Sequence, residues 1–196
     1  MKKILAMIAL VSLAAGAQAG LIEVQGGEIY TAPTNNNFVS GDDYNIGGNV
    51  FATTAVDLTF TYLGHEAGYN NDFFFQNDSY NLNNKSNAVG NSLSVSNVSA
   101  GLLDFRFYAN NISAGLANGE NKDFGSAQSF AVMLDYTFGG VFYDAVLYWD
   151  DSGAGPDDNH DDHIIGLNAV AVPEPATLAL FGLGLVGLVL ARRRQQ

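Results

Sequence analysis

The sequence predicts an all-β domain, an antiparallel β-sandwich of jelly-roll type, on three observations. Apolar and polar residues alternate with a period of two through the middle of the chain. Clusters of Asn, Asp, Ser and Gly separate these runs, and no stretch of the domain shows a convincing helical period. Both ends of the chain break the pattern with uncharged apolar runs beside basic residues. The chain therefore divides into residues 1–19, 20–172 and 173–196.

The N-terminal segment has the three parts of a secretory signal peptide. Met1-Lys2-Lys3 is basic, residues 4–13 are apolar, and Ala17-Gln18-Ala19 places small residues where a signal peptidase cleaves. Cleavage after Ala19 leaves Gly20 as the first residue of the mature chain. No cysteine follows the small residues, which excludes a lipoprotein.

Within the domain, the clearest alternation predicts strands at residues 56–62, 103–108 and 130–136, with shorter candidates at 21–30, 72–76, 92–98 and 163–172. The strongest local unit is a hairpin: strands 129–136 and 141–150 flank Thr137-Phe138-Gly139-Gly140, whose two glycines supply the backbone freedom of a turn. Asn-rich segments such as Asn81-Leu82-Asn83-Asn84 are predicted to be turns. Short strands joined by polar turns favour a sandwich over a doubly wound fold.

The domain is strongly acidic. The chain has 20 acidic and 8 basic residues and a formal net charge of −12, yet only Lys85, Arg106 and Lys122 are basic between residues 20 and 172. Such a surface repels nucleic acid, which we do not expect as a partner, and it favours cations or simple solubility. Cysteine is absent, so disulfides, thiolate chemistry and Cys-ligated zinc are excluded.

Residues 149–163 form the densest group of potential metal ligands. Asp157, Asn159 and Asp161 alternate as the first ligands of an EF-hand do, but Asp162 and Asn168 stand where that loop requires Gly and Glu, so this is not an EF-hand. A looser Ca²⁺ cage is one hypothesis. The alternatives are a solvated acidic turn and a zinc site through His160, His163 and an Asp. The candidate Ca²⁺ ligands are Asp150, Asp151, Asp157, Asn159, Asp161 and Asp162.

Aromatic residues suggest a second kind of site. Phe73-Phe74-Phe75, with Tyr69 and Tyr80 nearby, could stack on sugar rings, although three consecutive Phe are more often a strand buried on both faces. No nucleophile motif and no His-Glu-x-x-His is present, so we expect a protein that is not an enzyme. The alternative is a secreted polysaccharide hydrolase that uses two loop carboxylates, since that chemistry needs only two acids at the right separation.

The C-terminus has three ordered elements: Pro173-Glu174-Pro175, an uncharged apolar run at residues 176–191, and Arg192-Arg193-Arg194. A helix over the apolar run would be about 24 Å long, slightly under the thickness of the hydrocarbon core. We therefore predict one transmembrane helix at residues 176–191. The positive-inside preference keeps the arginines in the cytoplasm and the domain in the periplasm.

These three elements resemble the PEP-CTERM sorting signal. The resemblance implies recognition by an exosortase, a membrane transpeptidase-like cysteine protease, in Gram-negative bacteria that make exopolysaccharide. Pro173, Glu174, Pro175 and the Arg cluster are then features of a substrate rather than catalytic residues. We expect an exported protein, held at the inner membrane facing the periplasm and then passed to the cell surface or the extracellular matrix of a biofilm. Its β-domain would be structural or carbohydrate-binding, with exopolysaccharide as a candidate partner.

Overall fold

The computed structural model describes residues 20–110, 115–122, 128–151, 159–173, 184 and 192. The predicted signal peptide at residues 1–19 lies outside this part of the chain, and so does the predicted transmembrane segment at 176–191 apart from Gly184. In the described part of the chain, no helix has both the length and the apolar character needed to cross a bilayer.

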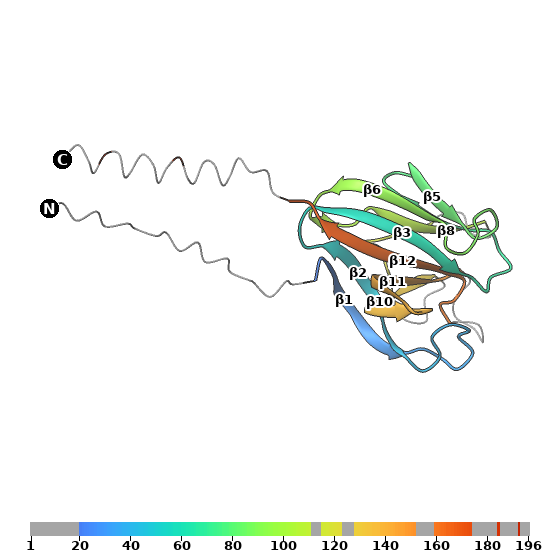
Figure 1. The fold of residues 1–196 in the computed structure, drawn as a ribbon. Helices are drawn as coiled ribbons and strands as arrows, with labels where there is room; N and C mark the ends of the chain where they lie inside the picture. Colours follow the sequence, from blue (N-terminus) through green and yellow to red (C-terminus); the bar gives the residue numbers. More distant parts are fainter. Residues whose placement is uncertain are drawn as a thin grey trace.

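The described strands form two antiparallel sheets (Figure 1), so the prediction of an all-β, antiparallel domain is confirmed. The jelly-roll connectivity stays a prediction. The larger sheet runs in the order β1 (Ile22–Thr31), β2 (Asp43–Ala52), β10 (Ser129–Phe138), β11 (Val141–Asp150), β12 (His163–Ala171), β3 (Val56–Gly64), β6 (Ser92–Val98), and β7 (Gly101–Leu102) pairs with β2. The smaller sheet runs in the order β5 (Tyr80–Asn83), β4 (Asn71–Phe75), β8 (Phe105–Ala109), β9 (Leu116–Ala117).

An aromatic core joins the two sheets. Phe60 of β3 lies 4.9 Å from Phe73 of β4, measured between ring centroids. Phe107 of β8 stacks on Trp149 of β11 with centroids 5.1 Å apart and planes only 7° from parallel. All four side chains are fully buried. Because one face of each sheet contributes to the same apolar cluster, the two layers pack face to face.

The other face of the larger sheet carries a second apolar core. Tyr44 of β2, Tyr148 of β11 and Ile164 of β12 belong to it. The segment between β1 and β2 contributes Ala32 and Val39, which are also buried, and so covers this face. Residues 129–133 of β10 and 145–150 of β11 are therefore buried on both faces, as their nearly continuous apolar sequence requires, whereas the ends of the two strands near the turn are partly exposed.

β2 is not among the strands expected from the sequence, because Asn45, Gly47 and Gly48 are residues typical of turns. Close packing between β1 and β2 explains why glycine stands at two positions in this pair of strands: a Cβ at Gly27 of β1 or at Gly48 of β2 would overlap the Asn45 side chain. At Gly47, where φ is +82°, the regular alternation of side chains between the two faces is interrupted. Tyr44 and Ile46 therefore face one core, whereas Val50 and Ala52 face the other.

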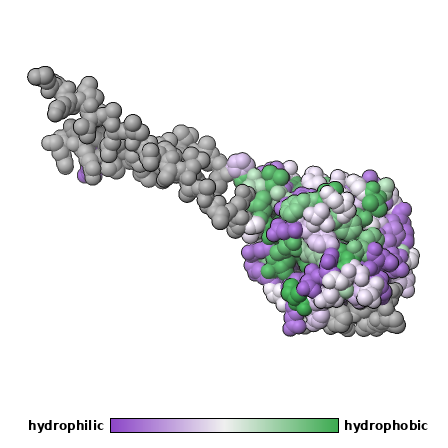
Figure 2. Space-filling model, turned by 60° about the horizontal axis from the view of Figure 1, so that its bottom comes forward, coloured by the Kyte–Doolittle hydropathy of each residue, from purple (hydrophilic) through white to green (hydrophobic). Residues whose placement is uncertain are grey.

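The predicted hairpin is present as β10 and β11, with Ser129 opposite Asp150 and Phe138 opposite Val141. Its turn consists of Gly139 and Gly140, both with positive φ, as a two-residue turn of the primed type needs. The predicted turn at residues 81–84 is wrong, because residues 80–83 form β5 and pair with β4. Apolar and hydrophilic residues are interspersed on the face turned forward in Figure 2.

Candidate functional site

The two ends of the domain meet at the turn between β2 and β3. The Thr53 amide donates to the Leu21 carbonyl at 3.0 Å, and the Thr53 hydroxyl donates to the Gly20 carbonyl at 3.1 Å. Two residues further on, the Ala55 carbonyl accepts a hydrogen bond from the Val172 amide at 2.9 Å. Both ends of the described domain therefore lie at one pole, which we call the tail pole (Figure 1).

The predicted sorting residues follow directly from this pole. β12 ends at Ala171, Val172 is still hydrogen-bonded to the domain, and Pro173 is exposed. Among the predicted signal-cleavage residues, Gly20 is described and exposed, while Ala17 and Ala19 lie outside the described residues. Arg192 is described as helical, and the remaining predicted residues of the sorting motif lie outside: Glu174, Pro175, Arg193 and Arg194.

The acidic segment lies at the other end of β12, about 27 Å from Ala171 at the usual rise of a strand. We call this end, which holds residues 64–71 and 159–163, the distal pole. Asp150, Asp151, Asn159, Asp161 and Asp162 are all buried there. The alternative of a solvated acidic turn is therefore wrong for these residues. Asp157, the remaining predicted ligand, lies outside the described part of the chain.

Backbone amides hold two of the buried carboxylates in place. Asp161 Oδ2 accepts from the Asn37 amide at 2.8 Å, and Asp162 Oδ2 accepts from the Asp151 amide at 2.9 Å. The Glu66 amide donates to the Asp161 carbonyl at 2.9 Å, which fixes the loop after β3 against this segment. The orientation of both carboxylates is thus set by the fold.

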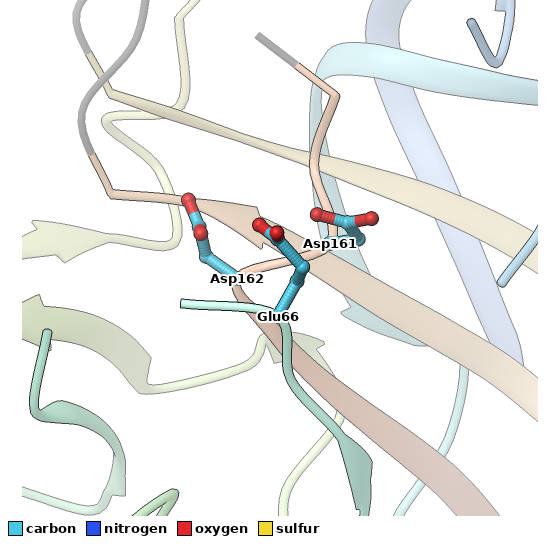
Figure 3. Close-up of side chains that lie close together, drawn as sticks. All are labelled: Glu66, Asp161 and Asp162. Atoms are coloured by element: carbon cyan, nitrogen blue, oxygen red, sulfur yellow. The ribbon is translucent and has the colours of Figure 1, made fainter. Parts of the chain in front are cut away.

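Three carboxylates come together at the distal pole (Figure 3). Ligand oxygens of Glu66, Asp161 and Asp162 all lie within 4.8 Å of one another, and Figure 3 shows Glu66 between the two aspartates. Glu66 is exposed, whereas Asp161 and Asp162 are buried. Glu66 is not among the ligands expected from the sequence, because it stands next to His65 without other acids and far from the Asp-rich segment. No local signal could have found it.

Asn71, at the start of β4, contacts the same group. Its Nδ2 donates to Asp151 Oδ2 at 2.7 Å and to the Asp162 carbonyl at 3.2 Å. The side chain is fully buried, and its Oδ1 has no hydrogen-bond partner among the described residues. The same holds for Oδ1 of Asn159, which is 2% exposed.

The two histidines of the zinc alternative lie against different cores. His160 Nε2 lies 2.7 Å from the Ser129 hydroxyl, and its ring packs on Tyr44 on one face of the larger sheet. His163 packs on Tyr62 and Phe107 on the other face. Burial lowers the pKa of His163 to about 3, with a smaller contribution from His65, so its imidazole is neutral. The carboxylate cluster contains neither histidine.

The aromatic residues proposed for sugar stacking divide between core and surface. Phe73 and Phe75 are buried, as expected for a strand in the core. Phe74 points the other way, and the Arg106 guanidinium lies 4.7 Å from its ring centroid. These two residues, together with Asp78 and Asp104, help to line a cavity of about 190 Å³. Arg106 also pairs with Asp78 at 2.6 Å, which raises the pKa of Arg106 and lowers that of Asp78.

Fold and tail together define an all-β domain whose last strand continues directly into a terminal segment of different composition. Residues 171–194 match the family model of the PEP-CTERM protein-sorting motif. The predicted sorting signal is therefore confirmed, and it implies an exported protein that an exosortase sorts and that is associated with a membrane before processing. No curated protein and no solved structure matches the chain.

Proposed function

We propose that this chain is an exported, non-enzymatic surface or extracellular-matrix protein, from which an exosortase removes the tail and leaves the β-domain as the mature form. One observation carries the proposal. The sorting motif begins at residue 171, where β12 ends, and among the residues that the structure describes Val172 is the last that is hydrogen-bonded to the domain. Cleavage beyond Val172 would leave every described strand in place.

The geometry also supports an orientation. With the Arg cluster in the cytoplasm, the tail pole faces the inner membrane and the distal pole points away from it. The acidic cluster of the distal pole, Glu66, Asp161 and Asp162, then lies on the periplasmic side, about one strand length from the anionic lipid that would repel it.

Processing can be tested in an exosortase-producing host with the full chain and a variant that combines Pro173→Ala, Glu174→Ala and Pro175→Ala. We expect the parent to appear as a shortened form, measured by mass spectrometry, while the variant keeps its tail and stays in the membrane fraction. Glu120→Ala, an exposed change in the domain, is the control and should be processed like the parent. Equal processing of the tail variant, or a parent found in the cytoplasm with its signal intact, would contradict the proposal.

A second role, carbohydrate binding, is favoured by the cavity beside Arg106. It combines the face of Phe74 with carboxylate, amide and guanidinium groups from Asp78, Asn77 and Arg106, a set of partners suited to sugar hydroxyls. We expect Phe74→Ala to weaken retardation of the protein in gels that contain the host exopolysaccharide. Phe142→Ala removes an exposed Phe elsewhere and should not. Equal retardation of the two variants would contradict this role.

The host exopolysaccharide also distinguishes a carbohydrate-binding role from the hydrolase alternative. A non-enzymatic module leaves the length of the polysaccharide unchanged, whereas a hydrolase releases reducing ends. We expect no release. Release that single Asp substitutions abolish would instead establish catalysis by two carboxylates.

A further inference from the structure

We infer that Glu66, Asp161 and Asp162, together with the Asn71 carboxamide, form a Ca²⁺ site at the distal pole. This inference does not depend on the sorting role of the tail. It replaces the loop-only ligand set expected from the sequence with one that joins three separate segments: the loop after β3, the start of β4 and the residues before β12.

The spacing of the oxygens fits this ion. Ca²⁺ binds six to eight oxygens at 2.3–2.6 Å, so two ligands on opposite sides of the ion are about 4.6–5.2 Å apart. One carboxylate oxygen from each of Glu66, Asp161 and Asp162 lies within 4.8 Å of the other two. The Asn37 and Asp151 amides already orient the two buried carboxylates, as hydrogen bonds from neighbouring groups orient metal ligands.

The Asn71 carboxamide is the independent sign of a ligand. Its nitrogen is bonded to Asp151 Oδ2 and to the Asp162 carbonyl, yet its oxygen, fully buried, has no hydrogen-bond partner in the described part of the chain. Buried amide oxygens nearly always have a protein donor, an ordered water or an ion as partner, and beside three carboxylates we infer that the partner is a cation. Asn159 Oδ1 on the same acidic segment is buried and without a partner in the same way.

The ligand chemistry selects among cations. Carboxylate and amide oxygens without sulfur or imidazole are ligands for a hard ion and disfavour zinc. Mg²⁺ demands near-ideal octahedral geometry at 2.0–2.1 Å and keeps several of its waters, so a group of protein oxygens of which two carboxylates are buried suits Ca²⁺ better. Glu66 is exposed, so water has access to complete the coordination and the ion has a path of entry. Bound Ca²⁺ would hold the three segments together once the protein is outside the cell.

The test uses the full chain in detergent micelles. The variant is Glu66→Gln, because it removes one ligand charge at an exposed position and should leave the fold intact. Extracellular Ca²⁺ modules bind with a Kd of about 0.1–1 mM, so 10 mM Ca²⁺ should raise Tm by about 3–10 °C relative to chelator. Glu66→Gln should lose at least half of this shift, with a Kd about tenfold weaker by calorimetry. Glu120→Gln, an exposed control of the same type, should behave as the parent.

A local readout comes from Tb³⁺, which substitutes for Ca²⁺ at oxygen sites and luminesces when a nearby indole absorbs. The chain has a single tryptophan, Trp149, whose carbonyl accepts from the Asp162 amide at 3.0 Å. We expect Trp-sensitised luminescence that Ca²⁺ displaces and that Glu66→Gln weakens. The inference is overturned by an unchanged Tm of the parent in Ca²⁺, by an equal shift in Mg²⁺, or by a Glu66→Gln variant that binds as tightly as the parent.

Discussion

Replacing Phe60 with alanine tests whether the aromatic core holds the two sheets together. Phe60 projects from β3 of the larger sheet and is fully buried. Its ring lies 4.9 Å from Phe73 and 4.9 Å from Phe75, both on β4 of the smaller sheet. It is therefore a direct contact between the two layers, and Phe60→Ala leaves a cavity at their interface.

The magnitude follows from these contacts. Truncation of a buried Phe to Ala costs about 3–5 kcal/mol of unfolding free energy. Two tilted aromatic pairs are lost as well, and each is worth about 0.5–1.5 kcal/mol beyond its buried area, so we expect the upper end, about 4–5 kcal/mol. For a chain of this size the corresponding drop in Tm is about 8–20 °C.

The assay is urea unfolding of the mature chain, followed by the fluorescence of Trp149, which stacks on Phe107 in the same core. Phe142→Ala is the matched control: Phe142 is 51% exposed on β11, so its loss should cost less than about 1 kcal/mol. If Phe60→Ala also costs less than about 1 kcal/mol, the packing of the two sheets described here is refuted.

Three further predictions concern single contacts. Asn118→Ala should lower the free energy of unfolding by about 2–4 kcal/mol in the same assay, because the Asn118 side chain is hydrogen-bonded to the backbone of Val50 and Leu103 and its loss leaves buried groups unsatisfied. A decrease of less than about 1 kcal/mol would contradict this reasoning. Gly166→Ala should cost about 1–3 kcal/mol, since the new Cβ lies 2.5 Å from the Tyr143 ring, and Tyr143→Ala in the same chain should relieve most of that cost. Burial and a 2.6 Å hydrogen bond to Asp42 raise the pKa of Tyr136 to about 12. Because this folded-state pKa lies above the unfolded value of about 10, the contribution of Tyr136 to stability is present below pH 10 and lost as pH rises toward 12. Carbon-13 NMR of labelled tyrosine should show Tyr136 titrating at lower pH in the Asp42→Asn variant than in the parent. An unchanged titration of Tyr136 would contradict the role of Asp42.

Local patterns in the sequence were enough to predict most of the strands and the hairpin. β6 is present at residues 92–98 as expected, because alternation of side chains along a strand is a property of consecutive residues. β2 and β5 were missed for the opposite reason. Their Asn and Gly residues are typical of turns, and contacts with β1 and β4 make them strands.

The sorting signal can be recognised without the fold, since Pro173, the apolar run and the terminal arginines are a linear feature that needs no partner from elsewhere in the chain. Which acids lie together, in contrast, depends on how the strands pair. Asp161 and Asp162 are buried beside Glu66 because the loop after β3 and the segment before β12 meet where those two strands pair. Pairing between strands that are distant in the sequence depends on packing of the whole core, and no local pattern records it.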